Sequence, residues 1–128
     1  MANLGMITVV VDNYDEAIEY YTTALGFTLV EDTTMSETKR WVVIAPDPTQ
    51  GAALLIAEAT TPTQQTAIGN QTGGRVGFFL YTDNFDRDYA RMAEHNVQFT
   101  EQPRNEEFGK VVVFADKYGN LWDFIERR

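Results

Sequence analysis

The chain has 128 residues, a length that suits one compact domain with a hydrophobic core of its own. It contains no cysteine, which excludes disulfides and thiolate metal sites, and its net charge of −9 argues against a nucleic-acid partner because phosphates would be repelled. No stretch reaches the roughly 18–20 apolar residues of a membrane span and no signal peptide is recognisable, so the sequence predicts a cytoplasmic protein without membrane contact.

The first half of the chain predicts a β-α-β-β-β unit. Residues 5–11 are short and β-branched, as is typical of a strand. A helix is expected next, with Asn13 as its N-cap residue and Gly26 just after its last turn. Three further strands are expected, the last two joined by the turn-rich stretch PDPTQG, at residues 27–32, 40–45 and 52–57. Glu58, at the end of the last strand, is expected to be solvated.

After a polar segment the same pattern starts again. Residues 58–74 are rich in Thr and Gln and end in two glycines, which predicts a connector with at most one short helical turn. A strand, a helix ending at Asn96 and three strands are then expected, the strands at 75–82, 97–101, 110–115 and 121–125. The sequence therefore predicts one domain over residues 1–128, composed of a first module at 5–57, the connector at 58–74 and a second module at 75–126.

The two halves are related by an internal repeat. The tetrapeptide DNYD at residues 12–15 matches DNFD at residues 83–86, an offset of 71. Further segments match at offsets of 70 and 69, namely 25–29 on 95–99, and 42–56 on 111–125 without a gap. Because three consecutive segments match at nearly one offset, we interpret the chain as the duplication of a unit that is too small to bury its own apolar face.

Two motifs resemble the vicinal-oxygen-chelate superfamily, which includes glyoxalase I, bleomycin and fosfomycin resistance proteins and extradiol dioxygenases. VDNYDEAIEYYTTALGF at residues 11–27 is close to the family pattern V-x-D-x-x-x-A-x-x-F-Y-x-x-x-L-G-F, and FADKYGNLWDFIE at residues 114–126 is close to F-x-D-P-x-G-N-x-x-E-L. The resemblance implies an α+β fold in which two βαβββ modules form an eight-stranded, cup-shaped mixed sheet with helices outside. It also implies a ligand or metal inside the cup, and a homodimer.

The resemblance implies four metal-ligand positions, one on the first and one on the last strand of each module. The family motif and the internal repeat carry these positions to Met6, Leu54, Gly77 and Asp123. Only Asp123 suits a hard divalent ion, since a thioether is a soft ligand and Leu54 and Gly77 offer no ligand atom. The single histidine, His95, is expected near the end of the second helix, where a cation suits the helix dipole. We therefore expect neither a metal nor another cofactor.

Strand alternation then assigns side chains to the interior of the cup. These expected ligand-binding residues are mostly apolar with a few polar groups, as is usual for small-molecule pockets: Met6, Thr8, Leu54, Ile56, Arg75, Gly77, Phe79, Tyr81 and Asp123. Two structural alternatives stay open, an ion pair between Asp123 and Arg75, and a core role for Phe79 and Tyr81. No catalytic residue is identified, because the sequence contains no P-loop, nucleophile elbow or H-E-x-x-H motif.

Three functions are compatible with these observations. The missing metal ligands, the apolar cup and the acidic charge favour a metal-free binder of a small molecule of cationic or aromatic character, similar to bleomycin resistance proteins. A lyase, isomerase or dioxygenase of the same superfamily is the alternative, with an atypical metal site at Asp123 that could include Glu58. The third is an interaction module that forms an obligate dimer and has no ligand.

Overall fold

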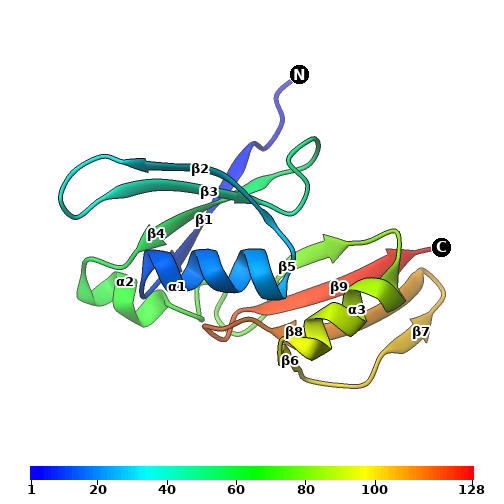
Figure 1. The fold of residues 1–128 in the computed structure, drawn as a ribbon. Helices are drawn as coiled ribbons and strands as arrows, with labels where there is room; N and C mark the ends of the chain where they lie inside the picture. Colours follow the sequence, from blue (N-terminus) through cyan, green and yellow to red (C-terminus); the bar gives the residue numbers. More distant parts are fainter. The chain divides into compact units, whose positions relative to one another are not determined.

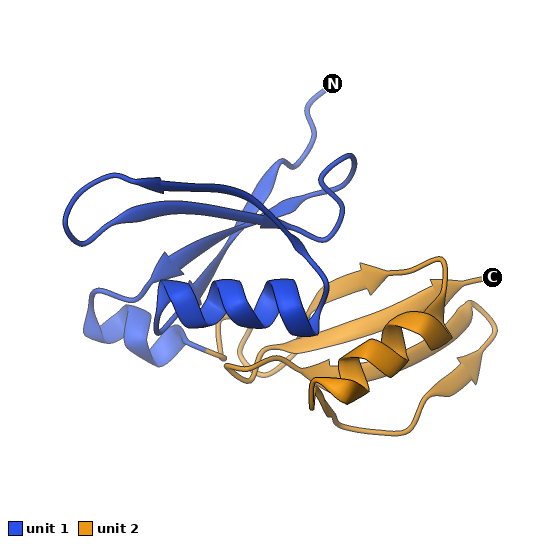
Figure 2. Cartoon of the chain, viewed as in Figure 1, with its two compact units in different colours: residues 1–68 blue, residues 69–128 orange.

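The computed structural model describes residues 1–128 and divides the chain into two compact units, Met1–Ile68 and Gly69–Arg128 (Figure 1; Figure 2). The boundary falls inside the polar segment expected at 58–74. Each unit contains one sheet and a helix that packs on it, so the α+β fold class is confirmed. None of the helices has the length and apolar character needed to cross a membrane.

The first unit is built on a four-stranded sheet with the strand order β1-β4-β3-β2. β1 and β4 run parallel, and the other neighbouring strands run antiparallel. Helix α1 continues into a short π-helix, η1, and the connector forms the helix α2. The elements are β1 Met6–Val11, α1 Tyr14–Glu19, η1 Tyr20–Ala24, β2 Thr28–Thr34, β3 Arg40–Ala45, β4 Ala53–Glu58 and α2 Pro62–Ala67.

The second unit repeats this arrangement in a five-stranded sheet. Its strand order, β5-β9-β8-β6, corresponds to that of the first sheet, and β5 and β9 again run parallel. The additional strand, β7, pairs with β8 in a stretch that the sequence analysis did not predict as a strand. The elements are β5 Val76–Tyr81, α3 Phe85–Glu94, β6 Gln98–Phe99, β7 Arg104–Glu106, β8 Gly109–Ala115 and β9 Leu121–Arg127.

The core of each unit lies between its helix and one face of its sheet. In the first unit Tyr21 of η1 is fully buried. In the second unit the ring of Phe85 in α3 lies 5.0 Å from that of Phe124 in β9, and the ring of Phe78 stacks on Trp122 at 4.4 Å. Buried aromatic pairs of this kind contribute to stability beyond their hydrophobic area, so these rings fix the face of the second sheet that is turned toward α3.

The main helices of both modules are capped at their N-termini by the same pair of residue types, an asparagine and a glutamate. The side chain of Asn13 accepts a hydrogen bond from the amide three residues later at 2.9 Å, as predicted for an N-cap. In addition, the first amide of each helix donates to a glutamate at the end of the module's last strand, Tyr14 to Glu58 at 3.0 Å and Phe85 to Glu126 at 2.7 Å. The expectation that Glu58 is only solvated is therefore wrong, because its carboxylate caps α1.

The first helix contains one residue more than the second, and the structure shows where this residue is accommodated. At the end of α3 the amide of Val97 donates to the carbonyl of Met92 at 3.0 Å. The corresponding bond in the first unit joins the amide of Phe27 to the carbonyl of Tyr21 at 2.9 Å, and it spans one more residue. A π-helix places an extra residue in each turn, so η1 absorbs the insertion without displacing the residues on either side.

Candidate functional site

The face of the second sheet that is turned away from α3 carries large exposed aromatic side chains. Phe79 and Tyr81 of β5 are 57% and 51% exposed, whereas Phe78 between α3 and the sheet is buried. The predicted alternative, that Phe79 and Tyr81 are core aromatics, is therefore wrong. We call this surface the open face of the second unit. The sheet register and alternation assign to it Phe79, Tyr81, Val111, Val113, Asp123, Ile125 and Arg127, of which Val111 and Ile125 are buried.

Asp123 lies in the middle of the open face and has no partner for its carboxyl group. Phe79 is its neighbour on β5 and Val113 its neighbour on β8. The predicted ion pair with Arg75 does not form, and Arg75 is exposed before the start of β5. Burial raises the pKa of Asp123 above its ordinary value; the positive charge of Arg104 opposes this shift, and the negative charge of Glu101 adds to it.

Arg104 is the positive charge that affects the pKa of Asp123, but its side chain is bound to two other carboxylates. Its Nε donates to both carboxylate oxygens of Glu101, each at 3.1 Å, and its Nη1 donates to Glu106 at 2.7 Å. Glu101 also accepts a hydrogen bond from the amide of Val113 at 3.0 Å. These bonds tie β7 and the preceding loop to β8, so Arg104 serves the local structure and does not neutralise Asp123.

Sequence reasoning missed Arg127. Its guanidinium carbon lies 4.1 Å from the centre of the Tyr81 ring, a cation–π contact, and the side chain makes no hydrogen bond or ion pair. The predicted strand ended at residue 125, but β9 continues to Arg127. The signal was present in the alternation, since residues 123, 125 and 127 share one face of a strand.

In the first unit, the expected faces of β4 are wrong. The register places Val9 beside Ile56 and Thr8 beside Leu55. Leu54 and Ile56 therefore lie on the helix side of the sheet, and they are 5% and 1% exposed. Leu54 and Ile56 therefore do not share a face with Met6 and Thr8, as the prediction required. Leu55 is the β4 residue that lies beside Thr8, on the face turned away from the helix.

The physical reason is a difference in loop length that the ungapped match concealed. The loop between β3 and β4 has seven residues, 46–52, and the loop between β8 and β9 has five, 116–120. The ungapped match at an offset of 69 spread this two-residue difference over both sides of the loop. As a result, it aligned β3 with β8 and β4 with β9 one residue out of register each. A slip of one residue exchanges the two faces of a strand. The first-unit residue that corresponds to Asp123 is therefore Leu55, and no longer Leu54.

Met6 and Thr8 lie where alternation places them, whereas alternation is interrupted within β5. Met6 and Thr8 are exposed on the open side of the first sheet. Gly77 lies in β5 at a register irregularity between Val76 and Phe78. His95 is exposed at the C-cap of α3, as predicted.

The chemistry at the inherited metal positions does not fit a divalent ion. After the correction these positions are Met6, Leu55, Gly77 and Asp123, which together supply one thioether and one carboxyl group. No three His, Cys, Asp or Glu side chains lie close enough together in the chain to hold a metal ion. We therefore derive no reaction step through a metal.

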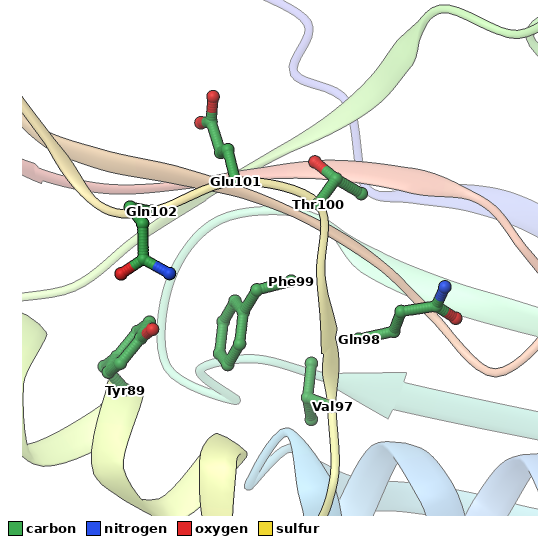
Figure 3. A pocket seen from close by; sticks show the side chains of 7 residues that line it. All are labelled: Tyr89, Val97, Gln98, Phe99, Thr100, Glu101 and Gln102. Atoms are coloured by element: carbon green, nitrogen blue, oxygen red, sulfur yellow. The ribbon is translucent and has the colours of Figure 1, made fainter.

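A separate hollow of about 580 Å³ lies beside α3, lined by Tyr89 and residues 97–102. In Figure 3 the side chains of Phe99 and Gln102 point toward Tyr89, whereas Glu101 points away. The rings of Tyr89 and Phe99 stack at 4.4 Å, so the aromatic groups of this hollow already contact each other. None of the residues predicted for ligand binding lines it, and we assign it no role.

Comparison with known proteins agrees with the fold. Residues 3–124 match the sequence model of the family described as the Glyoxalase/Bleomycin resistance protein/Dioxygenase superfamily. The chain is 50% identical over 121 residues to an uncharacterized protein of Shewanella frigidimarina (strain NCIMB 400), covering 94% of this chain and 90% of that protein. Among solved structures it is similar to UcmS2, with a TM-score of 0.83 and 26% identity over 98% of both chains.

A second solved structure has a described ligand class. The chain is similar to TnmS3, an antibiotic binding protein from Streptomyces sp. CB03234. The TM-score is 0.78 and the identity 26%, and the match covers 100% of this chain and 98% of that chain.

Proposed function

This chain belongs to the Glyoxalase/Bleomycin resistance protein/Dioxygenase superfamily, and we propose that it binds an organic small molecule without the help of a metal ion. The observation that carries the proposal is Asp123, a partly buried carboxyl group without a hydrogen bond or ion pair. Exposed Phe79 and Tyr81 lie around it on the same open face. Folded proteins usually provide partners for polar groups taken out of water and cover large aromatic patches, so this combination is suited to a ligand.

The class of ligand follows from the same residues. Aromatic side chains on an open sheet offer flat apolar surfaces for stacking, and an unpaired carboxylate attracts a cation or a hydrogen-bond donor. The structural similarity to TnmS3 at 26% identity supports an antibiotic-like compound as the ligand. We therefore propose a ligand of aromatic or cationic character, and we propose that the protein works as a cytoplasmic homodimer. Light scattering that gives the mass of a single chain at all concentrations would contradict the dimer.

A thermal-shift screen tests the binding proposal. Purified protein would be mixed with cationic and aromatic antibiotics and dyes at neutral pH, with and without a chelator. We expect at least one aromatic class to raise the Tm, equally in both conditions. Replacing Phe79 by Ala should weaken binding about tenfold or more, the cost of a central aromatic contact. The control is Phe108→Ala, which removes an equally exposed ring, 54% exposed, in the turn between β7 and β8.

Two results would contradict the proposal. The first is the absence of any stabilising compound. The second is binding that requires a metal, shown by near-stoichiometric retention of Zn²⁺, Ni²⁺, Mn²⁺ or Fe²⁺ after desalting and by its loss in Asp123→Ala. That second result would favour the enzyme alternative, a lyase, isomerase or dioxygenase with an atypical metal site.

A further inference from the structure

The open face of the second unit carries two charged groups, the carboxyl group of Asp123 and the guanidinium group of Arg127, at different positions along the strand direction. The register sets Phe79 level with Asp123, and Tyr81 level with Ile125. The guanidinium of Arg127 lies over the Tyr81 ring at 4.1 Å, so its charge stands at the level of Tyr81. Two residues along a strand span about 7 Å, so we expect the carboxyl and guanidinium groups to lie about that far apart along the strand direction.

Neither charged group forms a hydrogen bond or an ion pair with the rest of the chain. Asp123 has no hydrogen bond or ion pair, and Arg127 makes a cation–π contact with the Tyr81 ring but no hydrogen bond or ion pair. The nearby Arg104 is different, because Glu101 and Glu106 occupy its donors. The open face therefore keeps one carboxyl group without a partner and one guanidinium group whose N–H donors have no acceptor, and these two would bind opposite kinds of chemical group.

The two groups have complementary requirements. An ionised carboxylate only accepts hydrogen bonds, so Asp123 would bind an ammonium, amidine or hydroxyl group. A guanidinium only donates, in a planar fork that matches carboxylate or sulfonate oxygens, so Arg127 would bind an anionic or carbonyl oxygen. The ring of Phe79 has no aromatic neighbour and offers a flat surface beside Asp123.

We propose that the open face binds a flat, fused-ring aromatic molecule in one orientation, with a hydrogen-bond donor at Asp123 and an anionic or carbonyl oxygen at Arg127. This inference rests on the proposed function and adds the polarity of the ligand. A purely cationic aromatic molecule would bring positive charge against Arg127, and a purely anionic one would bring negative charge against Asp123. Molecules that carry both groups at opposite ends are therefore preferred.

Three naphthalene probes of matched size separate these requirements. The first, 6-(aminomethyl)-2-naphthoic acid, carries an ammonium group and a carboxylate at opposite ends. The second, 2-naphthoic acid, lacks the ammonium group, and the third, 2-(aminomethyl)naphthalene, lacks the carboxylate. Their dissociation constants would be measured by fluorescence titration at pH 7 in low salt. We expect the first probe to bind at least tenfold more tightly than either of the others.

Substitutions assign each end of the probe. Asp123→Asn should abolish the advantage of the first probe over 2-naphthoic acid, and Arg127→Gln should abolish its advantage over 2-(aminomethyl)naphthalene. Phe79→Ala should weaken the binding of all three probes by a similar factor. Lys117→Gln, which removes an exposed positive charge in the turn between β8 and β9, should change none of them. Circular dichroism would show that each variant is folded.

The outcomes distinguish this inference from the proposed function. Equal affinities for the three probes, or preferences that survive Asp123→Asn and Arg127→Gln, would overturn the inference while the protein still binds aromatic compounds. No binding of any probe and no compound that stabilises the protein in the thermal-shift screen would overturn both. If no probe binds and Phe79→Ala converts a dimer to a monomer, the open face is a contact between two copies of the chain, and the inference is wrong.

Discussion

At the scale of single residues, Asp116 explains why one of the two family-like motifs has its particular sequence. This carboxylate is buried in the turn between β8 and β9. It accepts hydrogen bonds from the amides of Tyr118 and Asn120 at 2.9 and 3.0 Å, and from the side chains of Asn120 and Trp122, both at 3.0 Å. The motif residues therefore shape the turn that precedes Asp123, and their pattern has a structural cause that does not depend on a ligand.

Replacing Asp116 by Ala should be severely destabilising. The substitution leaves four donors without their acceptor in a buried place, and we expect a loss of about 3 kcal/mol or more in the free energy of unfolding. Urea denaturation at pH 7 measures this loss. The matched control is Asp47→Ala, because Asp47 binds Thr49 and Gln50 in the corresponding turn of the first unit, where water can replace it. A cost for Asp116→Ala no larger than that for Asp47→Ala would contradict the prediction.

At the scale of secondary structure, η1 predicts that the two main helices respond differently to the loss of one residue. Thr23 is an exposed residue in η1, and deleting it should convert the segment to an α-helix while Leu25 and Phe27 stay in the core. Ala90 is an exposed residue in the middle of α3. Its deletion rotates the following residues by about 100°, which removes the fully buried Met92 from the core.

Unfolding experiments on the two deletion variants test this difference. We expect deletion of Thr23 to cost less than about 1–2 kcal/mol, and deletion of Ala90 to cost about 3 kcal/mol or to prevent folding. The cooperativity of the urea transition and the near-ultraviolet circular dichroism of the buried aromatic residues provide the measurement. Comparable losses of unfolding free energy in the two variants would show that η1 does not accommodate an inserted residue.

The order of the elements was predictable because local signals determine it. Strand propensity, the caps Asn13 and Asn84 and the residues that end the helices, Gly26 and Asn96, all depend on short stretches of sequence. Gly26 and Asn96 both have a positive φ, the conformation in which many helices end. The repeat then supplied the βαβββ organisation, since the same signals occur twice.

The errors arose where long-range pairing decides the structure. The faces of Leu54 and Ile56 depend on the register between β1 and β4, and a difference in loop length is invisible to an ungapped match. β7 has only three residues, all polar, and it is held by its pairing with β8 and by the bonds of Arg104. Strand alternation placed Asp123 on the same face as Phe79 and Tyr81, and the register agrees, while its role in ligand binding stays a prediction. Arg127 was missed because the predicted strand was too short.

At the scale of the whole molecule, the acidic charge affects stability in two opposite ways. Basic side chains hold carboxylates in place through ion pairs, as Arg40 does with Asp15 and Asp32. The hydrogen bond from Arg40 lowers the pKa of Asp32, although burial opposes the shift. For Asp88, burial raises the pKa, but hydrogen bonds from Arg87 and Thr82 outweigh this effect and the net shift is downward. Asp123 is shifted in the opposite direction.

These shifts predict how the stability of the chain changes between pH 3 and pH 7. An aspartate in the unfolded chain has a pKa of about 3.9. Because the folded-state pKa of Asp88 is lower, ionised Asp88 stabilises the folded chain above about pH 4, and this contribution is lost as the pH falls through the folded pKa. Because the folded-state pKa of Asp123 is higher, its ionisation destabilises the folded chain, and stability is lost as the pH rises from about 4 through the folded pKa.

Two substitutions should therefore have opposite effects on stability, each within its own pH range. At pH 7 we expect Asp88→Asn to lower the free energy of unfolding by on the order of 1–2 kcal/mol, since charge-assisted hydrogen bonds are lost. At the same pH we expect Asp123→Asn to raise it, by about 1 kcal/mol or less. Urea denaturation of both variants and the parent chain between pH 3 and pH 7 would show the Asp88→Asn difference shrinking as the pH falls below about 4. The Asp123→Asn difference would shrink at higher pH, as the pH falls from the raised folded-state pKa of Asp123 to about 4. A stability gain in Asp123→Asn that is the same at pH 3 and pH 7 would mean that packing, and not charge, makes this carboxyl group unfavourable in the folded chain.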